Sequence, residues 1–114
     1  MLAASWQHLP PGTVQQFLQR CEGWLLLMYG QPACGACRGW YRYVPQWLPT
    51  GWSLAYVDVV ADAAQAARHE IFHLPAFMLY RDGEFHAQLE APMAQQAWRD
   101  ALLEACAAPA QEEP

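Results

Sequence analysis

Residues 28–40 read MYGQPACGACRGW and hold Cys34 and Cys37, with two residues between them, directly after an uninterrupted apolar run. That run, residues 24–29, is too continuous for a half-exposed strand and predicts a central strand buried on both faces. Apolar residues recur at helical spacing from Trp40 onward, so Cys34 is expected at or near the N-terminus of a helix. A cysteine pair in this place is typical of a redox dithiol, of half a metal site, or of packing alone.

The helix start favours the redox interpretation. A thiolate is the reactive form of cysteine, and an isolated thiol is mostly protonated at neutral pH. The unpaired N–H groups and the positive end of the helix dipole favour an anion at Cys34, and Arg38 adds a positive charge one turn into the helix. Two intervening residues bring Cys37 close enough to Cys34 to form and break a disulfide. We expect an exposed Cys34 and a partly buried Cys37.

A metal site and inert packing are the alternatives. A structural zinc ion takes four tetrahedral ligands, typically from a second C-x-x-C or from paired histidines at comparable spacing. The sequence has no second C-x-x-C, and His69 and His73, one helical turn apart, lack a third ligand in register. A zinc site shared between two chains stays open. Packing suits Cys21 and Cys106, on or beside apolar helix faces, better than the C-G-A-C turn, which offers little apolar surface.

The remaining elements follow from turn residues and periodicity. Thr13 with Gln16 predicts a capping box at the start of a first helix, and Pro45 is expected to kink or shorten the helix after the cysteine pair. Asp82–Gly83 predicts a tight hairpin turn. The expected order is helix, strand, helix, strand, helix, hairpin, helix, and the first two strands should pair in parallel across the intervening helix. The later ranges are a strand at 53–62, a helix at 61–72, hairpin strands within 76–91 and a last helix opening at Pro92.

Length and composition indicate one folded domain. A chain of 114 residues leaves no room for two independent cores, and we assign residues 1–114 to a single domain. Within it, residues 1–12 are interpreted as an N-terminal extension and residues 108–114 as a frayed polar tail. Hydrophobic residues make up 54% of the chain, which excludes a disordered protein.

Charge and hydropathy exclude several classes of partner. With six arginines, no lysines and a formal charge of −5, the chain has no basic patch for nucleic acid or an anionic membrane. Its longest apolar run is far short of the roughly 20 residues that cross a bilayer. The first residues lack the basic and apolar regions of a signal peptide, so we expect a cytoplasmic protein. Four cysteines in a reducing compartment are more typical of catalysis or metal binding than of a disulfide framework.

Taken as a whole, the chain resembles the thioredoxin family. A strand, C-G-A-C at a helix start, and Leu74–Pro75 ahead of an R-D-G-E hairpin form that family's layout, from Thr13 to Cys106. The resemblance implies an α/β fold, a three-layer α/β/α sandwich with a central mixed β-sheet flanked by helices. It also implies thiol–disulfide exchange on protein disulfides, with Cys34 attacking and Cys37 resolving a mixed disulfide. We expect a monomer with no cofactor beyond this redox-active disulfide and with a disulfide reductase as electron donor.

The same resemblance implies a substrate groove beside the dithiol. The Leu74–Pro75 peptide bond is expected to be cis and to face the cysteines, with the backbone of Leu74 pairing with an extended substrate. His73 stands where the family usually has a small residue and is a candidate proton donor or acceptor. The positions expected to bind substrate are Ala33, Gly35, Ala36, His73, Leu74, Pro75 and Ala91.

Departures from the family pattern leave a second hypothesis open. Family members commonly carry a buried aspartate six residues before the first cysteine and a lysine near it on the next strand, where this chain has Met28 and Tyr56. Ala33 and Ala36 replace the usual tryptophan and proline beside the cysteines. Without the carboxylate, deprotonation of Cys37 must rely on water, the leaving thiolate or another base. The alternative function is a binding module or accessory chaperone of this fold with weak or no redox turnover.

Overall fold

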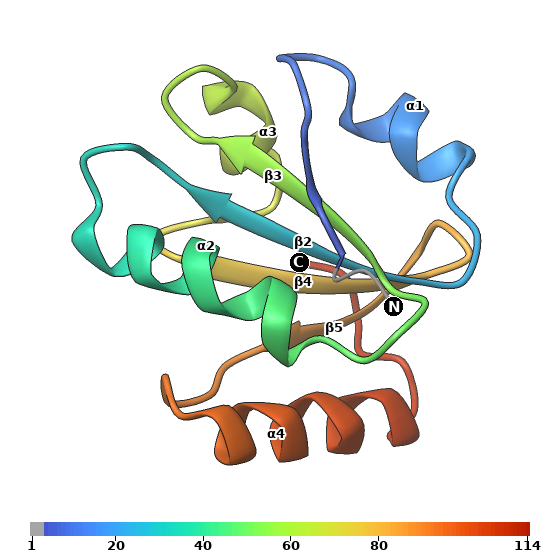
Figure 1. Cartoon of the computed structure of the whole chain (residues 1–114). Helices are drawn as coiled ribbons and strands as arrows, with labels where there is room; N and C mark the ends of the chain where they lie inside the picture. Colours follow the sequence, from blue (N-terminus) through green and yellow to red (C-terminus); the bar gives the residue numbers. More distant parts are fainter. Residues whose placement is uncertain (1–3) are drawn as a thin grey trace.

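The apolar run after the first helix forms β2, the central strand of a five-stranded sheet, in the computed structural model, which describes residues 4–114 (Figure 1). The strands lie in the order β1-β3-β2-β4-β5. Because β2 pairs in parallel with β3 and antiparallel with β4, the predicted mixed sheet is confirmed. Along the chain the elements are β1 (Trp6–His8), α1 (Val14–Gln19), β2 (Trp24–Gly30), α2 (Gly35–Trp47), β3 (Ser53–Asp58), α3 (Ala63–Arg68), β4 (Ala76–Arg81), β5 (Glu84–Leu89) and α4 (Gln95–Ala107).

Helices cover both faces of the sheet, as the prediction of three layers requires. Successive residues of a strand point to opposite faces, so Leu26 and Met28 pack with α2 and α4, whereas Leu25 and Leu27 pack with α1. Figure 1 shows α2 and α4 on one side of the sheet and α1 and α3 on the other. Every residue of β2 after the first is buried, which confirms a strand enclosed on both faces.

The short strand β1 was not predicted. It lies at the sheet edge and pairs in parallel with β3, with Trp6 opposite Leu54 and His8 opposite Tyr56. Three residues are too few to show a hydrophobic period, and the residues 1–12 were therefore interpreted as an extension. Long-range pairing with β3 decides the conformation of this segment, so the strand contributes to the sheet although its sequence carries no strand signal.

Trp6 of β1 also explains why α2 continues past Pro45. A proline inside a helix cannot donate to the carbonyl four residues earlier, which here belongs to Tyr41. The indole Nε1 of Trp6 donates to that carbonyl at 2.8 Å, and its ring stacks on the Tyr41 ring at 5.0 Å. The helix therefore runs to Trp47 rather than ending early, because a distant side chain replaces the missing hydrogen bond.

Several predicted element ends were wrong. Thr13 is the N-cap of α1, but its hydroxyl donates to the carbonyl of Pro10 at 2.6 Å and forms no capping box. Helix α4 begins at Gln95 rather than at Pro92, and α3 ends at Arg68. His69 therefore lies beyond the end of α3, and the expected one-turn helical relation to His73 does not form. The Asp82–Gly83 turn is confirmed, since both residues have positive φ.

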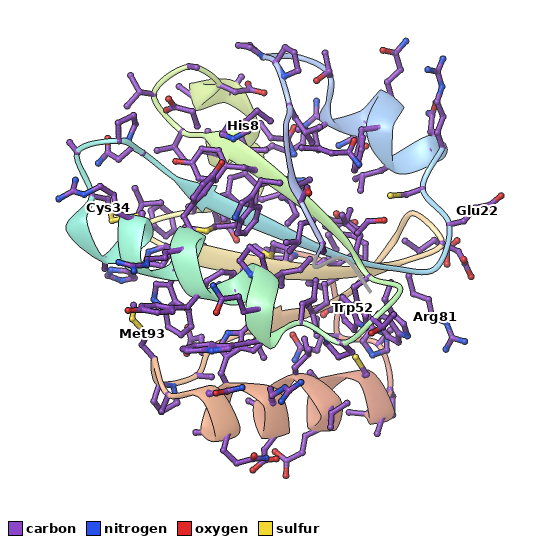
Figure 2. The ribbon with its side chains drawn as sticks, viewed as in Figure 1. His8, Glu22, Cys34, Trp52, Arg81 and Met93 are labelled. Atoms are coloured by element: carbon purple, nitrogen blue, oxygen red, sulfur yellow. A yellow bond between two sulfur atoms is a disulfide. The ribbon has the colours of Figure 1, made fainter. Side chains whose placement is uncertain are left out.

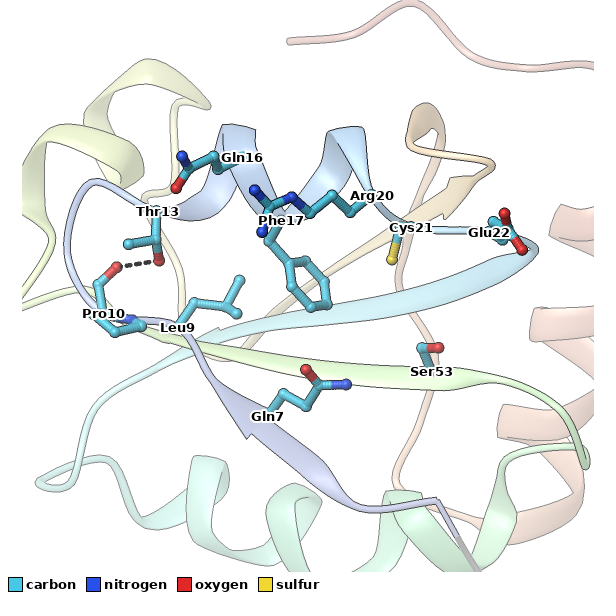
Figure 3. A pocket seen from close by; sticks show the side chains of 10 residues that line it. All are labelled: Gln7, Leu9, Pro10, Thr13, Gln16, Phe17, Arg20, Cys21, Glu22 and Ser53. Carbon is cyan, nitrogen blue, oxygen red and sulfur yellow. Dashed lines mark hydrogen bonds between the residues drawn. The ribbon is translucent and has the colours of Figure 1, made fainter.

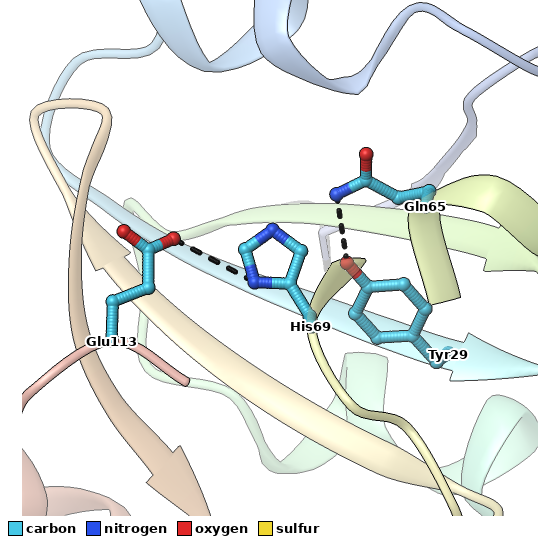
Figure 4. A network of polar contacts seen from close by, with 4 residues as sticks. All are labelled: Tyr29, Gln65, His69 and Glu113. Atoms are coloured by element: carbon cyan, nitrogen blue, oxygen red, sulfur yellow. Dashed lines mark hydrogen bonds and ion pairs between the residues drawn. The ribbon is translucent and has the colours of Figure 1, made fainter. Parts of the chain in front are cut away.

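The C-terminal tail, interpreted as frayed, makes defined contacts. The backbone N–H of Gln111 donates to the carbonyl of His86 at 2.7 Å, and its side-chain oxygen accepts from the N–H of Gln88 at 3.0 Å. Beyond this, Glu113 lies 3.6 Å from Nδ1 of His69 (Figure 4). The tail thus covers the open edge of β5, which would otherwise expose unpaired backbone groups. Within residues 4–114, no helix is long and apolar enough to span a membrane.

Candidate functional site

Cys34 and Cys37 form a disulfide at the start of α2. Cys34 is the N-cap residue, and its Sγ accepts a hydrogen bond from the backbone N–H of Cys37 at 3.1 Å. The predicted helix start is therefore confirmed, and Figure 2 shows Cys34 at that end of the ribbon. Burial is greater than expected: Cys34 is half-buried rather than exposed, and Cys37, only 2% exposed, belongs to the core. The reason is that the first turn of α2 packs down onto the sheet.

The sheet register brings Leu74–Pro75 towards the cysteine pair. Tyr29, near the end of β2, lies opposite Ala76 at the start of β4. The chain enters α2 shortly after Tyr29, and Pro75 comes directly before Ala76. The Leu74–Pro75 peptide bond is cis, as the resemblance implied, and Leu74 packs against the same core cluster as Cys34.

The other residues predicted to bind substrate differ in the solvent exposure of their side chains. Ala33, Gly35 and Ala36 are exposed beside Cys34, and Ala91 is half-buried against the core. His73 is exposed and lines a cavity of about 180 Å³ together with Pro75 and residues of β5. Its role in proton transfer stays a prediction.

Exposed apolar side chains lie near the same part of the chain. Phe72 is 81% exposed next to His73, and Met93 is 43% exposed. The methyl carbon of Met93 lies 3.2 Å from the position that a Cβ on Gly39 of α2 would take, which places it against that helix. Figure 2 shows Met93 on the α4 side of α2. These side chains offer apolar contact area without belonging to the core.

The free cysteines have the character expected of packing residues. Cys21 and Cys106 are both half-buried, and burial raises the pKa of each thiol. Cys21 lines a cleft of about 400 Å³ between α1 and the β1–β3 edge (Figure 3). Because a raised pKa disfavours the thiolate, neither sulfur is suited to act as a nucleophile near neutral pH. Among residues 4–114, no group of three histidine, cysteine or acidic side chains is placed to share a metal ion.

Buried polar residues gather on the opposite side of the sheet. Asp62 caps α3 by accepting the N–H of Gln65 at 3.2 Å and also accepts the N–H of Gly12 at 3.1 Å. Gln65 donates to the hydroxyl of Tyr29 at 3.2 Å (Figure 4). His69 is 3% exposed, and burial lowers its pKa although Glu113 opposes the shift. These groups stabilise the α1–α3 side of the sheet, opposite the α2 side that carries the Cys34–Cys37 disulfide.

Met28 and Tyr56 occupy the positions noted for their departure from the family pattern. Met28 is fully buried in the core cluster that contains Cys37, so it supplies no proton acceptor. Tyr56 is half-buried, and its pKa is raised by burial, with smaller contributions from Asp58 and Tyr41. Its hydroxyl therefore stays protonated near neutral pH.

A cleft of about 520 Å³ opens beside the buried cysteine, and sequence analysis did not anticipate it. Cys37 lines it together with His8, Gln31, Pro32, Arg38, Tyr41, Tyr56 and Asp58. His8 is exposed, and its Nε2 lies 2.6 Å from the hydroxyl oxygen of Tyr41. The lining residues come from β1, β3, α2 and the loop before α2, so no local sequence pattern predicts the cleft.

Comparison with known proteins identifies the fold. No protein-family model and no curated protein sequence matches the chain. A single-substitution variant of thioredoxin from Halobacterium salinarum superposes with a TM-score of 0.71 at 19% identity, over 100% of this chain and 98% of that one. Zinc-bound human ERp44 superposes with a TM-score of 0.72 at 14% identity, over 88% of this chain and 32% of that one. The chain has the thioredoxin fold, and it carries a close cysteine pair at the start of α2.

Proposed function

We propose that this protein is a thiol–disulfide oxidoreductase that acts on protein disulfides through Cys34 and Cys37. One observation carries the proposal: the Cys34 sulfur caps α2 and accepts the N–H of Cys37. The same N–H, with the positive end of the helix dipole, stabilises a thiolate at Cys34 after reduction. Cys37 is buried, and its Cα lies 5.2 Å from the Cα of Cys34, close enough for Cys37 to resolve a mixed disulfide on Cys34.

The reaction has two exchange steps. The Cys34 thiolate attacks one sulfur of a substrate disulfide, forming a mixed disulfide and releasing the first substrate sulfur as a thiolate. Cys37, after losing its proton, attacks the Cys34 sulfur and releases the second substrate thiolate. Two electrons pass from the dithiol to the substrate, and the Cys34–Cys37 disulfide remains. A disulfide reductase of the cytoplasm would return those electrons.

We assign substrate binding to the surface around Cys34 and Cys37. The backbone of Leu74 before the cis proline pairs with an extended segment of the client. The exposed residues Ala33, Gly35 and Ala36 leave room for that segment, and His73 and Ala91 border it. Small side chains beside Cys34 favour access by a protein substrate, because they leave the sulfur unshielded on that side.

An insulin reduction assay with dithiothreitol tests the proposal. We expect the wild type to accelerate precipitation of the insulin chains, and Cys34→Ser to fall to the uncatalysed rate. Cys21→Ser is the matched control, because it removes a thiol that lies away from the pair, and its rate should stay within about twofold of wild type. Equal background rates for wild type and Cys34→Ser would overturn the proposal.

The exposure of Phe72 and Met93 favours one alternative, a binding module with weak redox turnover. Capture with Cys37→Ser separates the two functions, because a catalyst lacking its resolving thiol accumulates clients as reducible mixed disulfides. Capture that is insensitive to reductant and is lost in Phe72→Ala would support the binding module instead.

A further inference from the structure

The cleft beside Cys37 is lined both by this buried cysteine and by the imidazole-bearing residue His8. Cys37 is shielded from bulk solvent, and its sulfur borders this cleft on the side of β1 and β3. Resolution of the mixed disulfide requires the Cys37 thiol to lose a proton, so an acceptor within reach of the cleft controls the second exchange step. This inference rests on the proposed function.

Tyr56 links the sulfur to the cleft. A Cβ placed on Gly30 would lie 3.0 Å from the Tyr56 hydroxyl oxygen and 3.2 Å from Sγ of Cys37. The hydroxyl and the sulfur therefore approach the same point above the glycine and lie no more than about 6 Å apart, a gap that one water molecule bridges. The absence of a Cβ at position 30 is what allows Tyr56 and Cys37 to approach this closely.

His8 and Tyr41 form the outer part of the same cluster. The His8 Nε2 and the Tyr41 hydroxyl oxygen lie 2.6 Å apart. The Tyr56 ring lies 5.1 Å from the His8 ring and 5.6 Å from the Tyr41 ring, between centroids. The pairing of His8 with Tyr56 across β1 and β3, and the contact of Trp6 with α2, hold the three rings together.

We propose that His8, hydrogen-bonded to Tyr41, is the terminal proton acceptor for Cys37, reached past the Tyr56 hydroxyl through water in the cleft. Tyr41 passes its hydroxyl proton to Nε2 and is reprotonated along the cleft by the proton leaving Cys37. The Cys37 thiolate then attacks Cys34, the new disulfide forms, and the substrate thiolate leaves. His8 returns its proton to solvent, to which it is exposed.

Two charged residues, Asp58 and Arg38, also border the cleft and have hydrogen-bond partners of their own. Asp58 Oδ1 accepts the N–H groups of Val60 at 2.8 Å and Ala61 at 3.3 Å, which commits it to the turn after β3. The Arg38 guanidinium donates to the carbonyl of Pro32 at 2.9 Å. Imidazole, by contrast, takes up and releases a proton most readily near neutral pH, which suits a turnover base.

The test measures the second exchange step alone. The chain with Cys21→Ser and Cys106→Ser is reduced and reacted with Ellman's reagent, which places a thionitrobenzoate group on Cys34. Attack by Cys37 then releases coloured thionitrobenzoate at a rate followed by stopped flow. The rate is measured across about pH 5 to 9 in this background and with His8→Gln, Tyr41→Phe, Tyr56→Phe and Asp58→Asn.

We expect His8→Gln to lower the release rate near neutral pH by about tenfold and to move the rise of the pH–rate profile to higher pH. Tyr41→Phe should act in the same direction, because it interrupts the path to Nε2. His86→Gln is the matched control, since His86 lies on β5 and its Nε2 contacts the carbonyl of Ala105 at 2.8 Å. It should leave the profile unchanged.

The outcomes separate this assignment from the proposed function. A His8→Gln profile that superposes on the background profile would overturn the role of His8, and a shift seen only in Asp58→Asn would transfer that role to Asp58. If the background protein releases thionitrobenzoate no faster than its Cys37→Ser variant, the proposed function fails and the assignment fails with it. Urea unfolding of each variant verifies that the altered rates do not come from lost folding.

Discussion

The two sides of the sheet hold similar chemical groups and use them differently. On the α1–α3 side, Asp62 is buried and accepts two backbone N–H groups, and the buried Gln65 donates to the hydroxyl of Tyr29. Burial also raises the pKa of Cys21 there. On the α2–α4 side, the Cys34 sulfur sits at a helix start and Cys37 borders an open cleft. Cysteines on the two sides therefore differ in their position relative to a helix terminus and to a cleft, although the residue type is the same.

The largest expected effect concerns the cores of the two sides. Trp98 of α4 is fully buried among other rings, whereas Leu18 of α1 lies at the end of a six-residue helix. We expect Trp98→Ala to lower the free energy of unfolding by about 4 kcal/mol and Leu18→Ala by about 2–3 kcal/mol, measured in urea.

The variant Trp98→Phe tests how much of that loss comes from removing the buried aromatic ring. The indole Nε1 of Trp98 has no hydrogen-bond partner in the described structure, so phenylalanine removes an unpaired donor and leaves only a small gap. The loss should be clearly smaller than for alanine. A comparable loss for both variants would show that the indole shape itself is required.

Thiol reactivity is the next contrast. In the reduced protein, Cys34 should react with iodoacetamide at neutral pH about 100-fold faster than Cys21 or Cys106, because the helix start favours its thiolate while burial raises the pKa of the other two. Mass spectrometry of timed samples gives the three rates. Equal rates would show that the helix start does not activate Cys34.

Gly30, which precedes the cysteine pair, and Gly35, which lies between the two cysteines, should differ in how well they tolerate a side chain. A Cβ at Gly30 meets Tyr56 and Cys37 at 3.0–3.2 Å, whereas one at Gly35 has its nearest neighbour at 3.7 Å, on Arg38. We expect Gly30→Ala to lower the free energy of unfolding by about 1–2 kcal/mol, and Gly35→Ala to have little effect. Urea midpoints measure both, and equal midpoints would contradict the close approach above Gly30.

The smallest effect is a pH dependence from the α1–α3 side. Burial lowers the pKa of His69 below its ordinary 6.5, so the unfolded chain binds a proton more readily than the folded one. Stability from this residue is present above the ordinary pKa and is lost as pH falls from there through the lowered value. His69→Gln should therefore flatten the fall in unfolding free energy below about pH 6.5, measured by urea unfolding at several pH values, and an unchanged pH dependence would contradict this role of His69.

Local patterns were sufficient for much of the fold. The apolar run forms β2, the Asp82–Gly83 turn joins the two hairpin strands, and Cys34 is the N-cap of α2, as predicted. Each depends on neighbouring residues alone, through hydrophobic continuity, tolerance of positive φ, or a turn before a helical period.

Features that depend on distant partners were missed. Strand β1 exists because of its pairing with β3, and the full length of α2 depends on a hydrogen bond from Trp6 to Tyr41, 35 residues away. The Thr13 hydroxyl was predicted to form a capping box with Gln16, but the path of the chain places the carbonyl of Pro10 within hydrogen-bond distance instead. No periodicity in a single sequence encodes such choices.

By itself, the sequence determined the cysteine pair, its place at a helix start and the central strand before it, because these depend on residues adjacent in the chain. Only the tertiary structure decided how deeply Cys37 is buried and which groups face it. His8, Tyr41 and Tyr56 meet beside the sulfur because β1, α2 and β3 pack together. The position of the proposed nucleophile is thus determined by neighbouring residues, whereas its proposed proton acceptor is brought to the site by long-range packing.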